Sequence, residues 1–229
     1  MSKQQSLIDI DAQAISSEMF DPLSTTNVGV TLAVGLLEQP LYSLPPEERF
    51  SGAGVYALYY SGSHPSYQRL VSLDNQRSKF PVYIGKAVRE NAKQGFNPTP
   101  TKQARLYSRL KDHAGSITQV NNLSLDDFHC RFLPLEDRHI VLAESVLITT
   151  FRPAWNGMGF GSKVVGGRRM EGRASLWDAL HPGRGGRPAG DDERAMEGDN
   201  KVQASIDMLA EPPADPVVAA MLKKIMRFV

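Results

Sequence analysis

A chain of 229 residues with 41% apolar content can bury one substantial core, so one main domain with appended arms is expected. Its formal net charge of +1 does not indicate any class of binding partner, so the distribution of the charges is more informative than their sum. The lone cysteine, Cys130, excludes an internal disulfide, and the apolar run 28–37 is too short to span a bilayer.

The N-terminal part of the chain combines an arm, a helix and a strand. Residues 1–24 lack a clear period and predict an extended or partly helical arm without a secretory signal. A cap within residues 25–27 predicts a helix that continues to Leu37, after which prolines force a loop. The aromatic and β-branched run 50–60 then predicts the first strand.

Two tyrosines stand out, one in this strand and one in the next predicted strand, 82–85. Because side chains alternate along a strand, Tyr56 shares a face with Leu58, and Tyr83 opposes the face of Ile84. The two phenols are therefore expected to meet on one side of a small sheet. Alternatively, both are ordinary amphipathic tyrosines that pack a hairpin.

Polar connections lie on either side of the second strand. Residues 61–81 and 87–100 are rich in turn formers and cations and predict loops. A helix is predicted from Thr101 to the region of Gly115, because its apolar residues recur at helical spacing.

This helix carries a polar stripe in which Arg105, Arg109 and His113 recur every four residues. The stripe is either a solvated basic face or a row of cations that face phosphate. The alternating segment 127–134 predicts a third strand, and 138–151 predicts a second strong helix.

Glu144 is the informative residue of the second helix. Helical spacing places it beside Ile140 and Leu147, so its carboxylate falls within the apolar, core-facing stripe. An unpaired buried carboxylate is costly, and a cation, a metal or hydrogen-bond donors should lie at hand. A structural ion pair with an arginine is the simplest of these.

A proline ends that helix and leaves Trp155 and Asn156 in a turn. The glycine-rich run 157–163 lacks the spacing of a nucleotide-binding loop and follows a helix instead of a strand, so a flexible basic loop is expected. Farther on, 191–215 is acidic and predicts a linker or surface arm. Residues 216–229 predict an amphipathic helix that packs on the core or contributes to a dimer.

Five short motifs follow one another in a specific order. They are Gly-Val-Tyr at 54–56, Tyr-Ile-Gly-Lys at 83–86, Arg109 with His113 one turn on, Glu144 within a helix, and Pro-Ala-Trp-Asn at 153–156. Together they resemble the GIY-YIG nuclease family, and most closely its type II restriction endonucleases, over residues 50–157. Val55 replaces the isoleucine of the family's first motif, which is a conservative departure.

The resemblance implies an α/β (α+β) fold with a small mixed central sheet flanked by helices, DNA-binding insertions and terminal arms. The expected divisions are an N-terminal arm and helix over 1–49, a catalytic core over 50–157 with insertions at 61–81 and 87–101, a basic glycine-rich DNA-contacting extension over 158–190, and an acidic linker with a C-terminal helix over 191–229.

The resemblance also implies a catalytic set. Its members are Tyr56, Tyr83, Lys86, Arg109, His113, Glu144 and Asn156. Glu144 would bind a single Mg²⁺, for which Mn²⁺ could substitute, and Arg109 would pair with a nonbridging phosphate oxygen. Tyr83 would orient water or phosphate, and Asn156 would brace the site.

Tyr56 is the candidate general base for the attacking water. A free tyrosine has a pKa near ~10, so that pKa must be lowered by Lys86, Arg109 or the metal, or else the proton must pass to His113. Which group finally accepts the proton is left open by the sequence.

Clusters of cations favour double-stranded DNA as the substrate, because they supply salt-sensitive phosphate affinity and arginines can read guanine. The predicted DNA-binding residues are Arg77, Lys79, Arg89, Lys93, Lys102, Arg105, Lys163, Arg168, Arg169 and Arg173.

The predicted activity is Mg²⁺-dependent hydrolysis of both DNA strands at a GC-rich palindrome of the CCGCGG type, giving 5′-phosphate and 3′-hydroxyl ends. Cutting a palindrome on both strands implies a homodimer, at least on DNA. A cognate DNA methyltransferase and a bacterial cytoplasm are the expected setting, with no membrane partner. The alternatives are a structure-specific repair or mobile-element nuclease of the same superfamily, and a non-catalytic DNA-binding protein.

Overall fold

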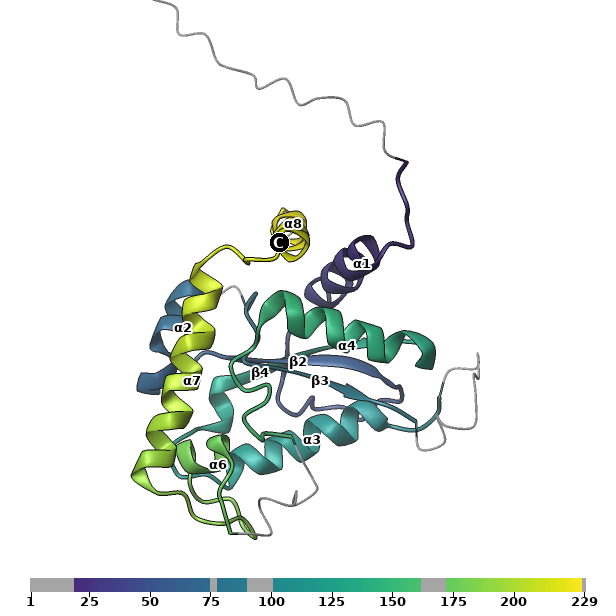
Figure 1. Ribbon diagram of the computed structural model, residues 1–229. Coiled ribbons are helices and arrows are strands. Elements are labelled where there is room, and N and C mark those ends of the chain that lie inside the picture. The colour runs from purple at the N-terminus through teal and green to yellow at the C-terminus, as the bar shows by residue number, and fades with distance from the viewer. Residues whose placement is uncertain (1–18, 75–77, 90–100, 162–171, 228–229) are drawn as a thin grey trace, which may run out of the picture.

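A four-stranded sheet lies at the centre of the protein (Figure 1). The computed structural model describes residues 19–74, 78–89, 101–161 and 172–227. The strands, in the spatial order β1-β4-β2-β3, are β1 (Tyr42–Ser43), β4 (Phe128–Pro134), β2 (Gly54–Tyr60) and β3 (Tyr83–Ala87). Each neighbouring pair is antiparallel.

Helices cover both faces of this sheet. The described elements are α1 (Thr25–Leu37), η1 (Pro65–Tyr67), α2 (Gln68–Asp74), α3 (Arg105–Thr118), η3 (Leu125–Asp127), α4 (Asp137–Phe151), α6 (Leu176–Leu180), α7 (Asp192–Ala210) and α8 (Pro216–Ile225). Figure 1 shows α1 and α4 over one face and α3 over the other, with α7 running alongside α2. Helix α8 packs on α1 and α4 and confirms the helix expected near the C-terminus.

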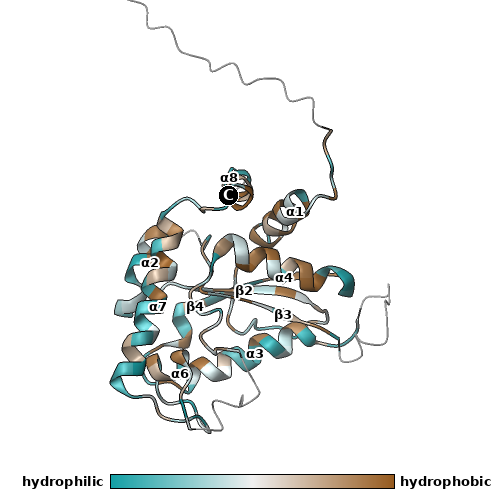
Figure 2. Ribbon diagram, viewed as in Figure 1, coloured by the Kyte–Doolittle hydropathy of each residue, from teal (hydrophilic) through white to brown (hydrophobic). Residues whose placement is uncertain are grey.

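The sheet divides the interior into two cores, and β2 serves both because it is buried along its entire length. Val55 and Ala57 pack into the core beneath α1 and α4. Tyr56 and Leu58 point the other way, into the core that includes Leu106 of α3. In Figure 2 the apolar colour is strongest on α1 and α4, and α7 is largely hydrophilic. Strand alternation thus places the first tyrosine on the expected face.

The expected α/β (α+β) class, a small sheet flanked by helices, is confirmed, but the named strands are all antiparallel to their neighbours where a mixed sheet was expected. Strands β3 and β4 do run in the same direction, yet β2 lies between them, so they never pair. Parallel pairing occurs in an isolated bridge between Gly52 and Ala104.

Two helix boundaries differ from expectation. The cap of helix α1 is Ser24, one residue before the expected caps, because its hydroxyl accepts a hydrogen bond from the Asn27 amide at 3.3 Å. Helix α3 begins at Arg105 and not at Thr101, and it continues through Gly115 to Thr118. A glycine inside a helix costs only about 1 kcal/mol, and burial of Ile117 in the next turn outweighs that cost.

Two segments expected to be loop or linker are helical. Residues 61–81 contain η1 and α2, because Leu70 enters the core from this segment. Residues 191–215 contain α7, whose Val202 and Ile206 lie one turn apart and are fully buried. An acidic exposed face is compatible with a helix whose opposite face is apolar. Among the described residues, none of the helices has the length and apolar character needed to cross a membrane.

Candidate active site

Tyr56 and Tyr83 meet on the α3 side of the sheet, as the strand alternation predicted. They lie on the neighbouring strands β2 and β3, with their ring centroids 6.3 Å apart. Tyr56 is opposite Gly85 in the register, and a Cβ at Gly85 would collide with the Tyr56 hydroxyl. The glycine of the second motif therefore makes room for the tyrosine of the first.

His113 completes a buried pair with Tyr56. Its Nε2 lies 2.7 Å from the Tyr56 hydroxyl, and the residue is only 1% exposed. The helical stripe that contains His113 is therefore not a solvated face at this position. One turn earlier, Arg109 donates from Nη2 to the carbonyl of Gly161 at 3.0 Å. This bond connects α3 to the segment that follows α4.

Phe160 and Gly161 cover the tyrosine–histidine pair, and the sequence did not reveal them as site residues. The Phe160 ring stacks on His113 with centroids 4.8 Å apart and meets the edge of Tyr83 at 5.0 Å. Gly161 has a φ of +74°, and a side chain there would contact the Tyr83 hydroxyl and His113. Residues 157–161 form a series of turns, as expected for a loop, but this loop is packed into the protein, because Phe160 is buried. Residues 162 and 163 lie outside the described part.

Glu144 of α4 forms an ion pair with the Nζ of Lys86 from β3. The side chains are 21% and 37% exposed, respectively, so the pair sits at the rim of the site and not in the core. A cation partner for Glu144 was expected, but the partner is a lysine and not an arginine. The lysine is the last residue of the motif Tyr-Ile-Gly-Lys, so the ion pair connects this second motif to α4.

The surroundings raise the pKa of the Tyr56 phenol well above its usual range. Burial is the largest cause, the neighbouring Tyr83 adds to it, and the guanidinium of Arg109 acts in the opposite direction. Burial likewise raises the pKa of Tyr83. Arg109 thus lowers the pKa of Tyr56, as expected, but burial outweighs it, and the pKa lies above its ordinary value and not below it. The alternative, transfer of the proton to His113, has the required hydrogen bond.

Asn156 braces β3 through two side-chain hydrogen bonds. Its side-chain oxygen accepts from the Ile84 amide at 3.0 Å, and its side-chain nitrogen donates to the Ile84 carbonyl at 2.8 Å. The amide thus satisfies both backbone groups of one residue, much as a neighbouring strand would. Beside it, the Trp155 amide donates to the Val82 carbonyl at 2.9 Å. These bonds hold the strand that carries Tyr83 and Lys86.

The donor set is compatible with one hard cation. Among the described residues there is no group of three or more histidine, cysteine, aspartate or glutamate side chains that would form a protein-only metal cage. Mg²⁺ commonly binds through one or two carboxylates, keeps several waters and takes phosphate oxygens. Glu144 has the right chemistry for this, and its charge acts on the pKa of both Tyr56 and Tyr83.

The predicted DNA-binding cations have varied surroundings. Lys102 is exposed and Lys79 is partly buried. Arg89 forms an ion pair with Asp137 at 3.1 Å, and the Arg105 Nε donates to the Val88 carbonyl at 2.9 Å. The exposed Arg173 lies 3.8 Å from Glu197. The others, Arg77, Lys93, Lys163, Arg168 and Arg169, lie outside the described residues.

Comparison with protein families agrees with this geometry. The family model described as the Eco29kI GIY-YIG domain matches residues 48–207, which is more than two thirds of the 229 residues. The matched range contains all of the predicted catalytic residues and continues through α6 into α7. None of the curated proteins matches the chain. The chain belongs to the Eco29kI family of GIY-YIG domains and is therefore a member of the GIY-YIG nuclease superfamily.

Proposed function

We propose that this protein is a type II restriction endonuclease that hydrolyses both strands of duplex DNA with Mg²⁺ as cofactor. The observation that supports this most directly is the buried hydrogen bond between the Tyr56 hydroxyl and His113 Nε2, at 2.7 Å, in the chain of an Eco29kI-type domain. A phenol with a histidine acceptor, next to an arginine and a carboxylate, has the components that phosphodiester hydrolysis requires.

In this mechanism the attacking water gives its proton to Tyr56 as the phenol proton passes to His113. The raised pKa of Tyr56 disfavours a standing phenolate, so a concerted transfer through the hydrogen bond is the lower-energy route. His113 would be charged after the transfer, and the face of Phe160 stacked on its ring can stabilise a cation.

The remaining residues stabilise the charge on the phosphate and position the reacting groups. Arg109, oriented by the Gly161 carbonyl, supplies a guanidinium for a nonbridging oxygen. A Mg²⁺ ion held by Glu144 would stabilise the charge on the phosphate and on the departing 3′ oxygen. Lys86 pairs with the Glu144 carboxylate, and its ammonium group would add positive charge near the phosphate. Tyr83 orients the reacting group, and Asn156 keeps its strand in place.

The finer parts of the proposal rest on the resemblance. We propose a GC-rich palindrome of the CCGCGG type, with 5′-phosphate and 3′-hydroxyl products. Two-strand cleavage of a palindrome calls for two symmetric sites, so the active form on DNA is a homodimer. A cognate methyltransferase would protect the host, and the setting is the bacterial cytoplasm.

Digestion of phage DNA in Mg²⁺ or EDTA tests the proposal. Glu144→Gln and Tyr56→Phe should abolish cleavage, and Tyr59→Phe provides the matched control. Tyr59 is on the same strand and is equally buried, but it belongs to the core on the opposite face of the sheet. Discrete fragments that require Mg²⁺ support restriction. Cleavage confined to branched or nicked DNA would assign the repair class instead, and binding without cleavage under any metal would refute the nuclease.

A further inference from the structure

A cavity of about 260 Å³ opens next to the active site and shares one wall with it. The shared wall consists of Arg109, His113 and Gly161. The opposite wall carries two more arginines, Arg184 and Arg187, from the segment that follows α6. Three arginines thus line a space beside the position proposed for the scissile phosphate.

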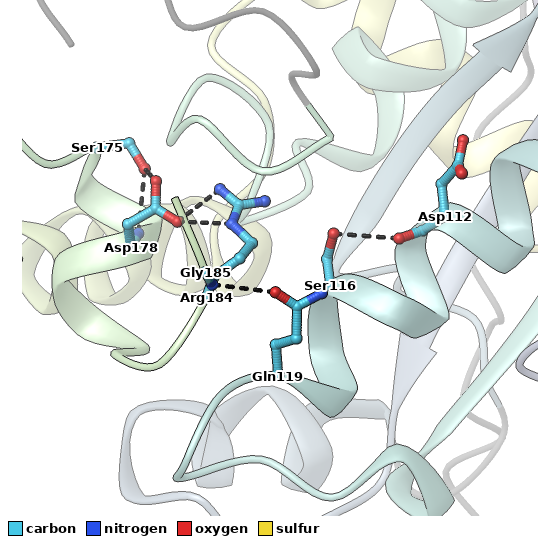
Figure 3. Close-up of polar contacts among 7 residues, drawn as sticks. All are labelled: Asp112, Ser116, Gln119, Ser175, Asp178, Arg184 and Gly185. Atoms are coloured by element: carbon cyan, nitrogen blue, oxygen red, sulfur yellow. Dashed lines mark hydrogen bonds and ion pairs between the residues drawn. The ribbon is translucent and has the colours of Figure 1, made fainter. Parts of the chain in front are cut away.

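The wall that carries Arg184 and Arg187 is fastened to the C-terminal end of α3 (Figure 3). The Gly185 amide donates to the side-chain oxygen of Gln119 at 3.0 Å, and the Asn121 amide donates to the Pro182 carbonyl at 3.0 Å. Gly183 has a φ of +124°, and a Cβ there would reach the Gln119 carbonyl. The two walls of the cavity are therefore held in fixed relation to each other.

Arg184 is oriented by a buried carboxylate. Its Nε donates to Oδ1 of Asp178 at 2.8 Å, and the side chains of the pair are only 6% and 2% exposed. Asp178 accepts in turn from the hydroxyl of Ser175, the residue that caps α6. The guanidinium also lies over the Trp177 ring, 4.9 Å from its centroid. In Figure 3 the third nitrogen of Arg184 points away from Asp178, toward the helix that bears Ser116.

This arrangement is more specific than a structural ion pair requires. A buried ion pair contributes little net stability against an apolar replacement of the same volume. A guanidinium held on one edge by a carboxylate, with the rest of the group directed at a cavity, is a preorganised phosphate ligand. The three arginines of the cavity outnumber the two nearby carboxylates, which are Asp178, already paired with Arg184, and the exposed Asp112 on the border.

We propose that this cavity binds the DNA backbone phosphate next to the scissile phosphate, with Arg184 and Arg187 as its ligands and Asp178 as the residue that positions Arg184. The assignment rests on the proposed nuclease function, because Arg109 forms the wall common to both phosphates. Binding a second phosphate would fix the register of the strand so that the scissile bond stays aligned with Tyr56.

The salt dependence of DNA binding measures this interaction. The full chain is titrated with a mixed-sequence duplex in EDTA at several salt concentrations, and the slope of log affinity against log salt is determined. Removal of one phosphate-binding cation should reduce the slope by about 0.9 and weaken binding roughly tenfold. We expect this change for Arg187→Gln and retention of the slope for Arg187→Lys.

A neutral pair tests Arg184 without leaving a lone buried charge. The double variant Asp178→Asn with Arg184→Gln should show the same reduction in slope, whereas a merely structural pair would change the melting temperature and not the slope. Arg69→Gln, an exposed arginine of α2 paired with Asp207, is the matched control and should keep the wild-type slope.

The two levels of the proposal fail in different ways. If the wild type cleaves DNA in Mg²⁺ and both cavity variants keep the wild-type slope, the second phosphate site is overturned and the nuclease function stands. If the wild type never cleaves, the proposed function is overturned along with the site that rests on it.

Discussion

Tyr56 and His113 should act as one proton-transfer unit, and a double-mutant cycle tests this. The hydroxyl and Nε2 are 2.7 Å apart in a site where Tyr56 has no exposed surface. Tyr56→Phe removes the group that receives the proton from water in the proposed mechanism. His113→Gln keeps a polar side chain next to the phenol but removes the proton acceptor. Loss of general-base catalysis typically slows a reaction by about 10²–10⁴-fold, or about 3–5 kcal/mol of activation free energy.

If the two residues relay one proton, the second substitution has almost nothing left to remove. The double variant should then be no slower than the worse single variant, which gives a coupling free energy of about 3–5 kcal/mol. If they acted independently, the two losses would multiply to about 10⁴–10⁸-fold. Single-turnover cleavage at saturating enzyme measures the rates directly. A multiplied loss would refute the relay, as would a Tyr56→Phe protein that cleaves at the wild-type rate.

Stability is measured in parallel, because the same changes affect a buried hydrogen bond. Tyr56→Phe leaves His113 without its phenol partner, which costs about 1–3 kcal/mol for an unsatisfied buried group. In a domain of this size each kcal/mol lowers the melting temperature by about 2–4 °C. Tyr59→Phe, from the opposite face of the same strand, separates the general effect of losing a buried hydroxyl from the catalytic one.

Individual side chains give three further predictions. Gly85→Ala should disable cleavage and lower the free energy of unfolding by about 1–3 kcal/mol, because the new methyl group collides with the Tyr56 hydroxyl. Gly115→Ala is the control, because its methyl group meets open space on α3 and should not destabilise the protein. Asn156→Ala removes both side-chain bonds to Ile84 and should destabilise by about 1–3 kcal/mol with loss of cleavage; a stable and active variant would show that β3 needs no brace. Burial lowers the pKa of His181 to about 3 from its usual 6.5, so the unfolded chain binds an extra proton and the free energy of unfolding should fall as the pH drops from 6.5 toward 3. In His181→Gln, denaturant titrations should show a smaller fall over this pH range. A fall as large as that of the wild type would contradict the assignment.

The parts of the site that the sequence predicts share a simple physical basis. Tyr56 and Tyr83 follow from strand alternation in two short apolar runs, and the need of Glu144 for a cation follows from its place in an apolar helix face. Local rules such as these depend on neighbours within a few residues. They locate a side chain on a face before the tertiary contacts are known.

The parts that the sequence does not predict depend on contacts between distant segments. Phe160 becomes a site residue only because it stacks on His113, which is 47 positions earlier in the chain. Its segment is rich in glycine, a composition that usually indicates a flexible loop, yet Gly161 is needed because a side chain would strike Tyr83. The placement of the segment that carries Arg184 is likewise not apparent from the sequence, because it depends on the hydrogen bond from the Gly185 amide to Gln119, at the end of α3.

The segment beyond the matched motifs is part of the same folded unit as the proposed catalytic residues. Trp177 of α6 and Ile206 of α7 belong to the core that also contains Tyr56. A second buried tyrosine–histidine contact, between Tyr67 and His181, joins η1 to the end of α6. Because the chain reaches the active site again at Phe160 and then packs back on this core, the shape of the site depends on α6 and α7 although neither carries one of the family's motifs. A nuclease core cut at residue 157 would lose the ring that covers His113 and the wall that holds Arg184.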